Sequence, residues 1–345
     1  MKLIILFGGA SYEHEISIVS AITLKDKLKN TELEFIFCDQ DHTFYLINPS
    51  NMKAKFFSSG GYKKEPKLNI KQNGFIQNKM FGSVEYNSVV LNLIHGADGE
   101  DGTISSLLDF FGIRYIGPRV DAAIFSYDKR YTKALCNYRD IKTLKYDVLY
   151  SHEHDRLELE YPVIVKPSRL GSSIGVSVVH NHSELDYALD VAFEFDKSVI
   201  VEPFIDGVKE YNLAGFMADG KIEYSIVEEP KKEKFLDFDK KYLDFSRSSQ
   251  VQKADITQEL ELKLKSAFDK IYNNLFDGAL IRCDFFVING EVYLNEINPI
   301  PGSMANYLFE NFEDSIKKLA NSIVEYKKIK IDYTYINSIS AAKGK

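Results

Sequence analysis

Residues 281–302, IRCDFFVINGEVYLNEINPIPG, contain two apolar runs on either side of Asn289-Gly290. An Asn-Gly pair between two such runs predicts a β-hairpin, because a tight turn needs residues that accept positive φ. Side chains alternate between the two faces of a strand, so Glu296 and Asn298 share one face. The stretch therefore predicts a hairpin with polar side chains gathered on one side.

Pairing of the two strands can bring Asp284 beside Glu296 and Asn298, and Arg282 lies on the same face as Asp284. Mg²⁺ prefers such oxygen ligands when the phosphates of a substrate complete its shell. The alternative is a solvated polar face on an edge strand. The apolar neighbours favour a buried hairpin, whose polar groups would need a partner. Asp284, Glu296 and Asn298 are thus the candidate metal ligands.

A second informative stretch is VIVKPSRLGSSIGVS at residues 163–177, where a strand with Lys166 leads through a glycine-serine loop into another strand. Backbone N–H groups of such a loop, with a lysine beside them, can bind phosphate oxygens. An ordinary hairpin turn has the same composition, since glycine and serine are common in turns. This stretch alone does not decide between the two.

The N-terminal segment alternates strands and helices. LIILF at residues 3–7 predicts a strand, Gly8-Gly9 a turn, and the residues after them have helical spacing. Further strands are expected at 34–39, 44–48 and 88–95. Such alternation predicts a parallel sheet that helices cover on both faces, forming a first domain at 1–118.

The rest of the chain predicts a central domain at 119–204 and a C-terminal domain at 205–345. A helical pattern runs from Ala122 to about Tyr146. Later helices are expected at 183–196 and 257–275, and later strands at 161–167, 175–179, 198–205, 211–218, 221–228, 279–287 and 292–298. Residues 231–248, rich in lysine and aspartate, are the candidate mobile loop.

Composition limits the kinds of function. With 345 residues and 45% hydrophobic content, the chain can bury a full core. A net charge of −7 argues against a nucleic-acid binder, which needs clustered Lys and Arg. The short N-terminal apolar run predicts neither a membrane span nor a signal peptide, so we expect a cytoplasmic protein. Scattered cysteines favour small buried side chains over disulfides or zinc ligands: Cys38, Cys136 and Cys283.

Five motifs together resemble a known family. They are FGGASYEHEIS (7–17), HGADGEDGTISSLLDFFGIRYIGP (95–118), SYDKRYTK (126–133), VIVKPSRLGSSIG (163–175) and NEINPIPGSMANYLF (295–309). In this order they resemble the D-alanine–D-alanine ligases, which are ATP-grasp carboxylate–amine ligases, from residue 4 to about residue 325. The resemblance implies an α/β, three-domain ATP-grasp fold with an N-terminal Rossmann-like parallel sheet, and a homodimer.

The resemblance implies an ATP site between the central and C-terminal domains. Lys129 and Lys166 match phosphate-binding lysines, which without this context would be ordinary surface charges. Glu202 matches the acceptor for the adenine amino group. The same site would include a backbone contact near Phe204, an apolar wall for the base at Phe286, and Ser172. Glu210 matches the ribose-binding carboxylate, although it stands one residue later than the usual spacing.

The resemblance also implies residues for the first substrate. Glu13 matches the carboxylate that holds the ammonium of the first D-alanine. Its alternative role is a favourable charge at a helix start, which is the role expected for Glu15. Ser172 and Tyr242 match residues that link to this glutamate and close over the substrates, and Lys241 matches a lysine that reaches the transferred phosphate.

Arg282 and the backbone N–H of Gly302 match groups that stabilise an oxyanion. His95, at a strand end beside the cleft, is a candidate substrate residue, although such a histidine is more often a hydrogen-bonding residue. After Gly302 the sequence departs from the family pattern. Ungapped counting puts Tyr307 and Leu308 at the contact with the second substrate's carboxylate, with Ser303 as a substitute after a small shift.

The reaction implied is the ATP-dependent joining of two D-alanines through a D-alanyl phosphate, for peptidoglycan precursors. Two Mg²⁺ ions, or Mn²⁺ in their place, would neutralise the phosphates. One alternative is a ligase of the same family that uses D-lactate or D-serine as the second substrate, and Tyr242 argues against the lactate type. Another is a non-catalytic ATP-binding regulatory protein, which would not need Arg282 beside Asp284 and Glu296.

Overall fold

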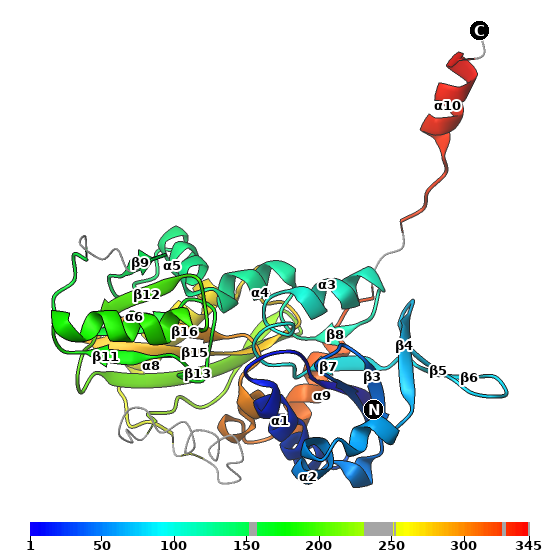
Figure 1. Cartoon of the computed structure of the whole chain (residues 1–345), viewed down its shortest axis with the longest axis horizontal. Helices are drawn as coiled ribbons and strands as arrows, with labels where there is room; N and C mark the ends of the chain where they lie inside the picture. Colours follow the sequence, from blue (N-terminus) through cyan, green and yellow to red (C-terminus); the bar gives the residue numbers. More distant parts are fainter. Residues whose placement is uncertain (152–156, 231–250, 252, 326–328, 344–345) are drawn as a thin grey trace.

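The computed structural model describes residues 1–151, 157–230, 251, 253–325 and 329–343. Within these residues the chain forms an eight-stranded sheet followed by two four-stranded sheets, with helices packed around them (Figure 1). The mixed α/β architecture that the sequence predicts is therefore present. The three sheets follow one another along the sequence, and the division of the chain into three domains stays a prediction.

The central part of the first sheet is parallel, as predicted. Its strands, in order across the sheet, are β2 (Glu32–Cys38), β1 (Lys2–Gly8), β7 (Val89–Asn92) and β8 (Tyr115–Ile116). All residues of β1 after the first are buried, which explains its continuous apolar run. The helices α1 (His14–Lys27) and α3 (Thr103–Phe110) lie between successive parallel strands in the sequence.

The outer part of the first sheet is antiparallel, which corrects the expectation of a wholly parallel sheet. β3 (Phe44–Ile47) follows β2 after only residues 39–43, and a parallel connection needs a dozen or more residues. Three strands continue the sheet outward: β4 (Lys67–Lys71), β5 (Gly74–Asn78) and β6 (Ser83–Tyr86). Short helical segments connect β3 to β4: η1 (Pro49–Asn51), α2 (Ala54–Ser58) and η2 (Gly61–Lys64).

The second sheet follows a pair of helices, α4 (Val120–Tyr127) and α5 (Lys129–Tyr138). The predicted helix to Tyr146 is wrong, because Asp128 interrupts it and residues 139–146 are not helical. The Asp128 carboxylate accepts from the Arg130 N–H and starts α5 as an N-cap. The sheet comprises β11 (Ser177–Val179), β10 (Val163–Pro167), β12 (Val199–Pro203) and β9 (Asp147–Leu149), with α6 (Leu185–Phe193) against it and η3 (His182–Glu184) directly before α6.

The third sheet contains the hairpin predicted from Asn289-Gly290. Its strands, in order, are β14 (Lys221–Tyr224), β13 (Lys209–Ala218), β15 (Leu280–Ile288) and β16 (Glu291–Asn298). Asn289 and Gly290 have φ of 52° and 77°, as a two-residue turn between twisted strands requires. The helices of this part are α8 (Gln258–Tyr272), η4 (Gly302–Leu308), α9 (Phe312–Ser322) and α10 (Thr334–Lys343).

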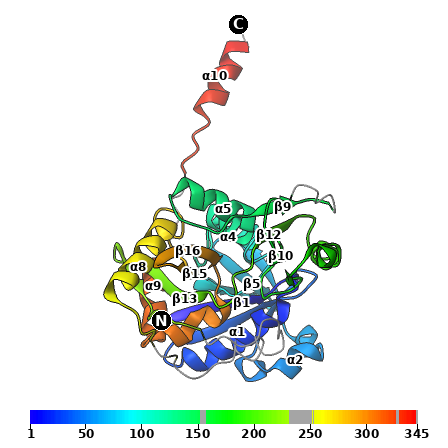
Figure 2. The same cartoon turned by 90° about the vertical axis from the view of Figure 1, so that its left-hand side faces the viewer.

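One hydrophobic core joins the two ends of the chain. Leu3 and Phe7 of β1 belong to the same buried cluster as Phe216 of β13, Leu308 of η4 and Ile316 of α9. The second sheet has a separate core beneath α6, so the first and third sheets are the more firmly joined. Both views show α10 projecting away from the sheets (Figures 1 and 2).

The three cysteines are buried and free, as expected: Cys38, Cys136 and Cys283. Among the helices of the described residues, none has the length and apolar character needed to cross a bilayer.

Candidate functional site

The β15–β16 hairpin brings together the predicted metal ligands. Asp284 lies opposite Glu296 in the strand register, and the Asn298 Nδ2 donates to Asp284 Oδ2 at 3.0 Å. The strand register shifts just after Asp284, so the pairing is irregular beside these side chains. The three oxygen-bearing side chains therefore gather on one face, next to Arg282, whose register partner is Asn298.

These side chains fit a hard divalent cation. Asp284 is buried, whereas the Glu296 side chain is 35% exposed and lines a small cavity together with Lys129. Within the described part of the chain, no group of three or more His, Cys, Asp or Glu side chains forms a metal cluster. The donor set is thus two carboxylates and one amide, which leaves room for phosphate oxygens and suits Mg²⁺.

Arg282 is held rigidly beside this face. Its Nε and Nη2 donate to the two oxygens of Asp284 at 2.7 and 2.8 Å, and its Nη1 lies 3.4 Å from the Tyr307 hydroxyl. Burial alone would lower the pKa of Arg282, but the Asp284 carboxylate raises it well above the usual value. A fixed, charged donor of this kind can stabilise a developing oxyanion without reorganising.

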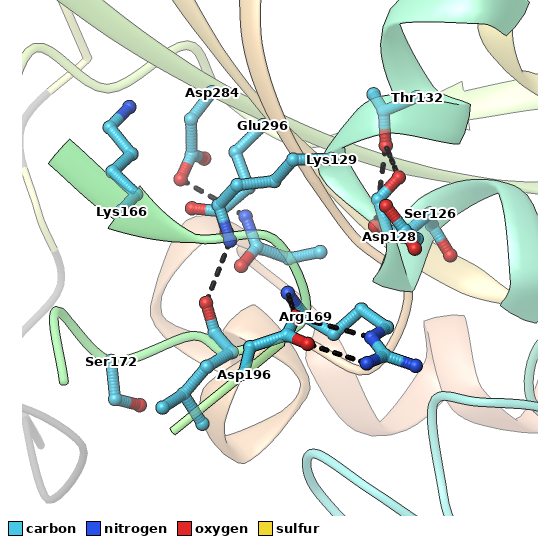
Figure 3. Close-up of polar contacts among 12 residues, drawn as sticks. Ser126, Asp128, Lys129, Thr132, Lys166, Arg169, Ser172, Asp196, Asp284 and Glu296 are labelled. Carbon is cyan, nitrogen blue, oxygen red and sulfur yellow. Dashed lines mark hydrogen bonds and ion pairs between the residues drawn. The ribbon is translucent and has the colours of Figure 1, made fainter. Parts of the chain in front are cut away.

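Lys129 connects the hairpin to the glycine-serine loop, as Figure 3 shows. Its Nζ donates to the Leu170 carbonyl at 2.7 Å and lies 3.7 Å from Glu296 Oε1. Its position at the start of α5 is set by the Asp128 cap and by its own N–H, which donates to the Ser168 carbonyl. A cation placed here can contact both a phosphate and the loop.

Glu202 on β12 is almost completely buried and has two lysine partners. Lys166 Nζ donates to Glu202 Oε2 at 2.7 Å, and Lys133 Nζ donates to Oε1. Burial alone would raise the pKa of Glu202, but the two lysines more than offset it and lower the pKa to about 2. Lys133 is absent from our sequence prediction, although it is four residues after Lys129 and so on the same helix face.

The other residues predicted for the nucleotide lie around Lys166. Glu210 on β13 and Phe286 on β15 are register partners, and the Glu210 charge helps to raise the pKa of Lys166, which burial alone would lower. The Phe204 N–H donates to the Pro162 carbonyl at 2.9 Å, so this N–H already has a partner. The structure thus brings Glu202 and Glu210 close enough to Lys166 to act on its charge, and it places Phe286 opposite Glu210 on the neighbouring strand.

Glu13 and Ser172 meet although 159 positions separate them in the sequence. The Ser172 hydroxyl donates to Glu13 Oε1 at 2.5 Å. Glu13 occupies the N-cap position of α1, but its side chain makes no capping hydrogen bond. The alternative role as a helix-start charge therefore fits Glu15, which lies in the first turn, better than Glu13.

The Glu13 carboxylate fits between two glycines. A Cβ at Gly96 would lie 2.8 Å from Oε2, and a Cβ at Gly171 would lie 3.0 Å from Oε1. Gly96 also has φ +72°, which disfavours any side chain there. Ser172 has φ 56°, so the loop brings its hydroxyl to Glu13 through an uncommon backbone conformation.

Electrostatics around Glu13 disfavour its charge. Burial raises the pKa of Glu13, and the nearby Glu296 raises it further, while Ser172 and Lys129 oppose them. Glu100, which the sequence analysis did not single out, lies in the same region. Burial raises its pKa well above the usual value, with contributions from Glu13 and Glu296. The signal for Glu100 was its place in the HGADGEDG motif, where Asp101 instead accepts from the Thr103 N–H.

His95 is buried and lies three residues beyond the end of β7. Its Nδ1 lies 2.7 Å from the Leu93 carbonyl, and burial lowers its pKa to about 4, so the ring is neutral near pH 7. Its carbonyl accepts from the Ser11 hydroxyl, which also accepts from the Glu13 N–H. His95 thus lies next to the Glu13 loop and helps to fix it.

The segment after Gly302 makes a left-handed turn. Ser303, Met304 and Ala305 have φ of 47°, 54° and 48°, although none of them is glycine. The Ser303 N–H donates to the Ser20 hydroxyl of α1 at 2.9 Å, which ties the turn to the first sheet's helix. Such a conformation costs energy and persists only where tertiary contacts impose it.

The residues predicted for the second substrate's carboxylate separate in this turn. Tyr307 points toward Arg282, which its hydroxyl meets at 3.4 Å. The Leu308 side chain is buried in the core that joins the two ends of the chain. Ser303 is also buried. Lys241 and Tyr242, together with the rest of the predicted loop at 231–248, lie outside the described residues.

Comparisons with known proteins agree with this geometry. Residues 2–118 match the family described as D-ala D-ala ligase N-terminus, and residues 120–325 match D-ala D-ala ligase C-terminus. The D-alanine--D-alanine ligase of Sulfurimonas denitrificans is 68% identical over 345 residues, which is 100% of both chains.

Solved structures show the same fold. The D-alanine-D-alanine ligase from Helicobacter pylori has a TM-score of 0.85 at 48% identity and covers 95% of this chain and 100% of its own. The VanG D-Ala:D-Ser ligase from Enterococcus faecalis has a TM-score of 0.76 at 25% identity, with 94% and 99% covered. The predicted ATP-grasp α/β fold is confirmed, and with matches over nearly its whole length the chain belongs to the D-alanine–D-alanine ligase family.

Proposed function

We propose that this chain joins two D-alanines into D-alanyl-D-alanine at the expense of ATP, for peptidoglycan precursors. The observation that carries the proposal is the position of Lys129. Its Nζ lies 3.7 Å from Glu296 Oε1 and donates a hydrogen bond to the Leu170 carbonyl. Leu170 directly precedes Gly171, which lies against the Glu13 carboxylate. A carboxylate suited to an ammonium and a face suited to a metal-bound phosphate are thus adjacent. That adjacency is what phosphorylation of an amino acid's carboxylate needs.

Asp284, Glu296 and Asn298 would hold two Mg²⁺ ions, which Mn²⁺ could replace. The metal would supply positive charge to the β- and γ-phosphates. Lys129 and Lys166 would add charge on the other side of the phosphates, and Glu202, Glu210 and Phe286 would hold the base and ribose. Arg282 is hydrogen-bonded to Asp284 through Nε and Nη2, and its Nη1 donates to the Tyr307 hydroxyl.

In the first step, Glu13 would hold the ammonium of one D-alanine. The carboxylate of that D-alanine then attacks the γ-phosphate of ATP, which gives D-alanyl phosphate and ADP. In the second step, the free amine of another D-alanine attacks the acyl carbon, loses a proton and expels phosphate. Arg282 and the Gly302 N–H would stabilise the tetrahedral oxyanion. Tyr307, whose hydroxyl accepts from Arg282, is the candidate contact for the second carboxylate, and Ser303 and Leu308 are further candidates from the same turn.

Acyl phosphates hydrolyse readily, so water must be excluded during the reaction. We infer that Lys241 and Tyr242 close over the substrates for this purpose. The three-domain division at 1–118, 119–204 and 205–345, and the homodimer, are further parts of the proposal. They are supported by the family to which the chain belongs.

The decisive experiment measures phosphate release with ATP and each candidate substrate. Release with D-alanine alone, and none with L-alanine, is expected. Mixtures of D-alanine with D-serine or D-lactate test the two alternative ligase activities through the identity of the product. ATP binding without phosphate release under any mixture would instead support a non-catalytic regulatory protein.

A further inference from the structure

Glu202 is paired with two lysines, of which the proposed ATP site has so far used only Lys166. Lys166 has been assigned to the phosphates, yet in the structure its Nζ donates to Glu202 Oε2. Once Lys166 turns toward phosphate oxygens, a buried carboxylate would lose half of its compensating charge. A buried carboxylate without a partner is strongly disfavoured and takes up a proton instead. Lys133 is the group that remains.

Lys133 is less exposed than Lys166. The Lys133 side chain is 4% exposed, compared with 14% for Lys166. Its Nζ lies 5.5 Å from the ring centroid of Tyr146, on which it can rest as a cation on an aromatic face. Since Lys166 lies nearer to solvent and Lys133 is enclosed, Lys133 is the lysine that can stay with Glu202 when a nucleotide enters.

Lys133 and Glu202 line a small cavity that extends to the metal face. The other lining residues come from α4, α5 and β16 and include Lys129, Thr132 and Glu296. Lys133 follows Lys129 by one helical turn on α5, so one helix face supplies a lysine to each end of the cavity. Lys129, proposed for the phosphates, and the Glu202 carboxylate thus line the same small cavity.

We propose that Lys133 is a positioning residue that holds the Glu202 carboxylate ionised and in place, and thereby makes the nucleotide site select adenine over guanine. This rests on the proposed function, in which Glu202 accepts from the adenine amino group. A carboxylate accepts hydrogen bonds and cannot donate them. Guanine presents a carbonyl where adenine has that amino group, so an ionised Glu202 repels it. A neutral group here would tolerate either base.

The two charged groups that contact Glu202 directly support this view. Lys133 approaches from α5 and Lys166 from β10, while Lys129 and Glu296 line the same cavity. Replacement of Lys133 by methionine leaves Glu202 with only the lysine that the phosphates would take. In that variant Glu202 should become protonated at a pH where the parent keeps it ionised.

The test compares ATP and GTP as substrates for the full-length protein, as kcat/KM for D-alanine-dependent phosphate release. In Lys133→Met the preference for ATP should fall roughly tenfold or more, mostly through the KM for ATP, with the KM for D-alanine unchanged. In Lys133→Met the KM for ATP should also rise as the pH is lowered from 8 to 6, whereas the parent protein should show no such rise. Lys142→Met, which removes an exposed lysine paired with Glu291, is the matched control.

Two further variants separate this role from a structural or phosphate-binding one. Lys166→Met should raise the KM for ATP and GTP together and leave their ratio unchanged. In a Glu202→Gln background, Lys133→Met should not alter the ratio further, because no carboxylate remains to be held. Lys133→Gln, which keeps a hydrogen-bond donor without the charge, replaces Lys133→Met if that variant does not fold.

An unchanged ATP to GTP ratio in Lys133→Met or Lys133→Gln overturns the inference, as does an unchanged pH profile. Binding of non-hydrolysable ATP and GTP analogues by calorimetry gives the same comparison without turnover. If the parent protein binds the ATP analogue but releases no phosphate with D-alanine, the proposed function fails while the selectivity of Lys133 is still measured.

Discussion

Glu13 and Glu202 are both buried glutamates of the candidate site, but the protein treats their charges in opposite ways. Glu202 is paired with Lys133 and Lys166, and its pKa is lowered to about 2. Glu13 receives the Ser172 hydroxyl, and among the described residues no lysine or arginine forms an ion pair with it. Burial raises its pKa instead.

The presence or absence of a lysine beside each glutamate indicates whether its ligand is neutral or positively charged. A carboxylate that receives a cationic ligand needs no cation from the protein, because the ligand brings one. A carboxylate that receives a neutral N–H donor gains no positive charge from its ligand, so the protein must supply the counter-charge that keeps the buried carboxylate ionised. Glu13 therefore suits an ammonium and Glu202 suits the amino group of a base.

The largest effect should come from removing the charge of Glu13. In Glu13→Gln the ammonium of the first D-alanine enters a buried site without its counter-charge, which should lower kcat/KM for D-alanine roughly hundredfold or more. The affinity for ATP, measured by calorimetry, should stay within about twofold. Equal losses of D-alanine and ATP affinity would assign Glu13 a structural role at the start of α1.

The two glutamates should also differ in what they do to stability without ligands. Glu202→Gln leaves two cations around a neutral group and should cost about 3 kcal/mol or more. Glu13→Gln removes a desolvated charge and should lose no stability, because a raised carboxyl pKa means that ionisation at neutral pH opposes folding. Thermal unfolding at pH 7 measures both. A lower midpoint for Glu13→Gln would contradict the comparison.

The pH dependence should separate the glutamates in the intact protein. In the proposed reaction Glu13 holds the ammonium as a carboxylate, so the KM for the first D-alanine should rise as the pH falls through the pKa of Glu13, which lies above the usual 4.5. Glu202 stays ionised to about pH 2, so it should add no pH dependence to ATP binding above that value. Initial rates over pH 5 to 8 with one substrate saturating would show whether only D-alanine responds.

A smaller effect is expected from Ser172→Ala. The lost hydrogen bond to Glu13 is worth about 0.5–1.5 kcal/mol, so kcat/KM for D-alanine should fall several-fold. Because the Ser172 hydroxyl lowers the pKa of Glu13, the pH at which the D-alanine KM begins to rise should move upward. The same pH profile in Ser172→Ala and the parent would argue against this contact.

The smallest effect is expected at an exposed glutamate. Glu291 forms an ion pair with Lys142, and both side chains are more than half exposed at 51% and 56%. Glu291→Gln makes the same chemical change as the two variants above, in a position where water screens the charge. Neither KM nor the unfolding midpoint should change measurably. A loss of activity here would mean that burial does not explain the contrast between Glu13 and Glu202.

Much of the site could be predicted from the sequence where local rules apply. Asn289-Gly290 forms the expected turn, and strand alternation brings Asp284, Glu296 and Asn298 together. The pairing of Glu13 with Ser172 came from the resemblance to the family, since nothing local relates residues so far apart. The antiparallel part of the first sheet was missed, although the short connection before β3 excludes a parallel strand.

Lys133 and the turn at 303–305 show what the sequence does not reveal. Lysines are usually solvated, and burial of Lys133 depends on β12, which lies about 70 residues further along the chain. Ser303, Met304 and Ala305 have no preference for a left-handed backbone. Their conformation comes from contacts with α1 and the shared core, which only the folded chain provides.

The hydrogen bond from the Ser303 N–H to Ser20 also bears on how this chain could be recombined with its relatives. The turn that contains Gly302 belongs by sequence to the C-terminal half, but a hydroxyl from the N-terminal half holds it. A chimaera that exchanges residues 2–118 would therefore exchange part of the support of the proposed oxyanion site. Such a graft should keep its activity only when the donor segment brings a hydroxyl to the position of Ser20, so the halves of this protein are not interchangeable modules.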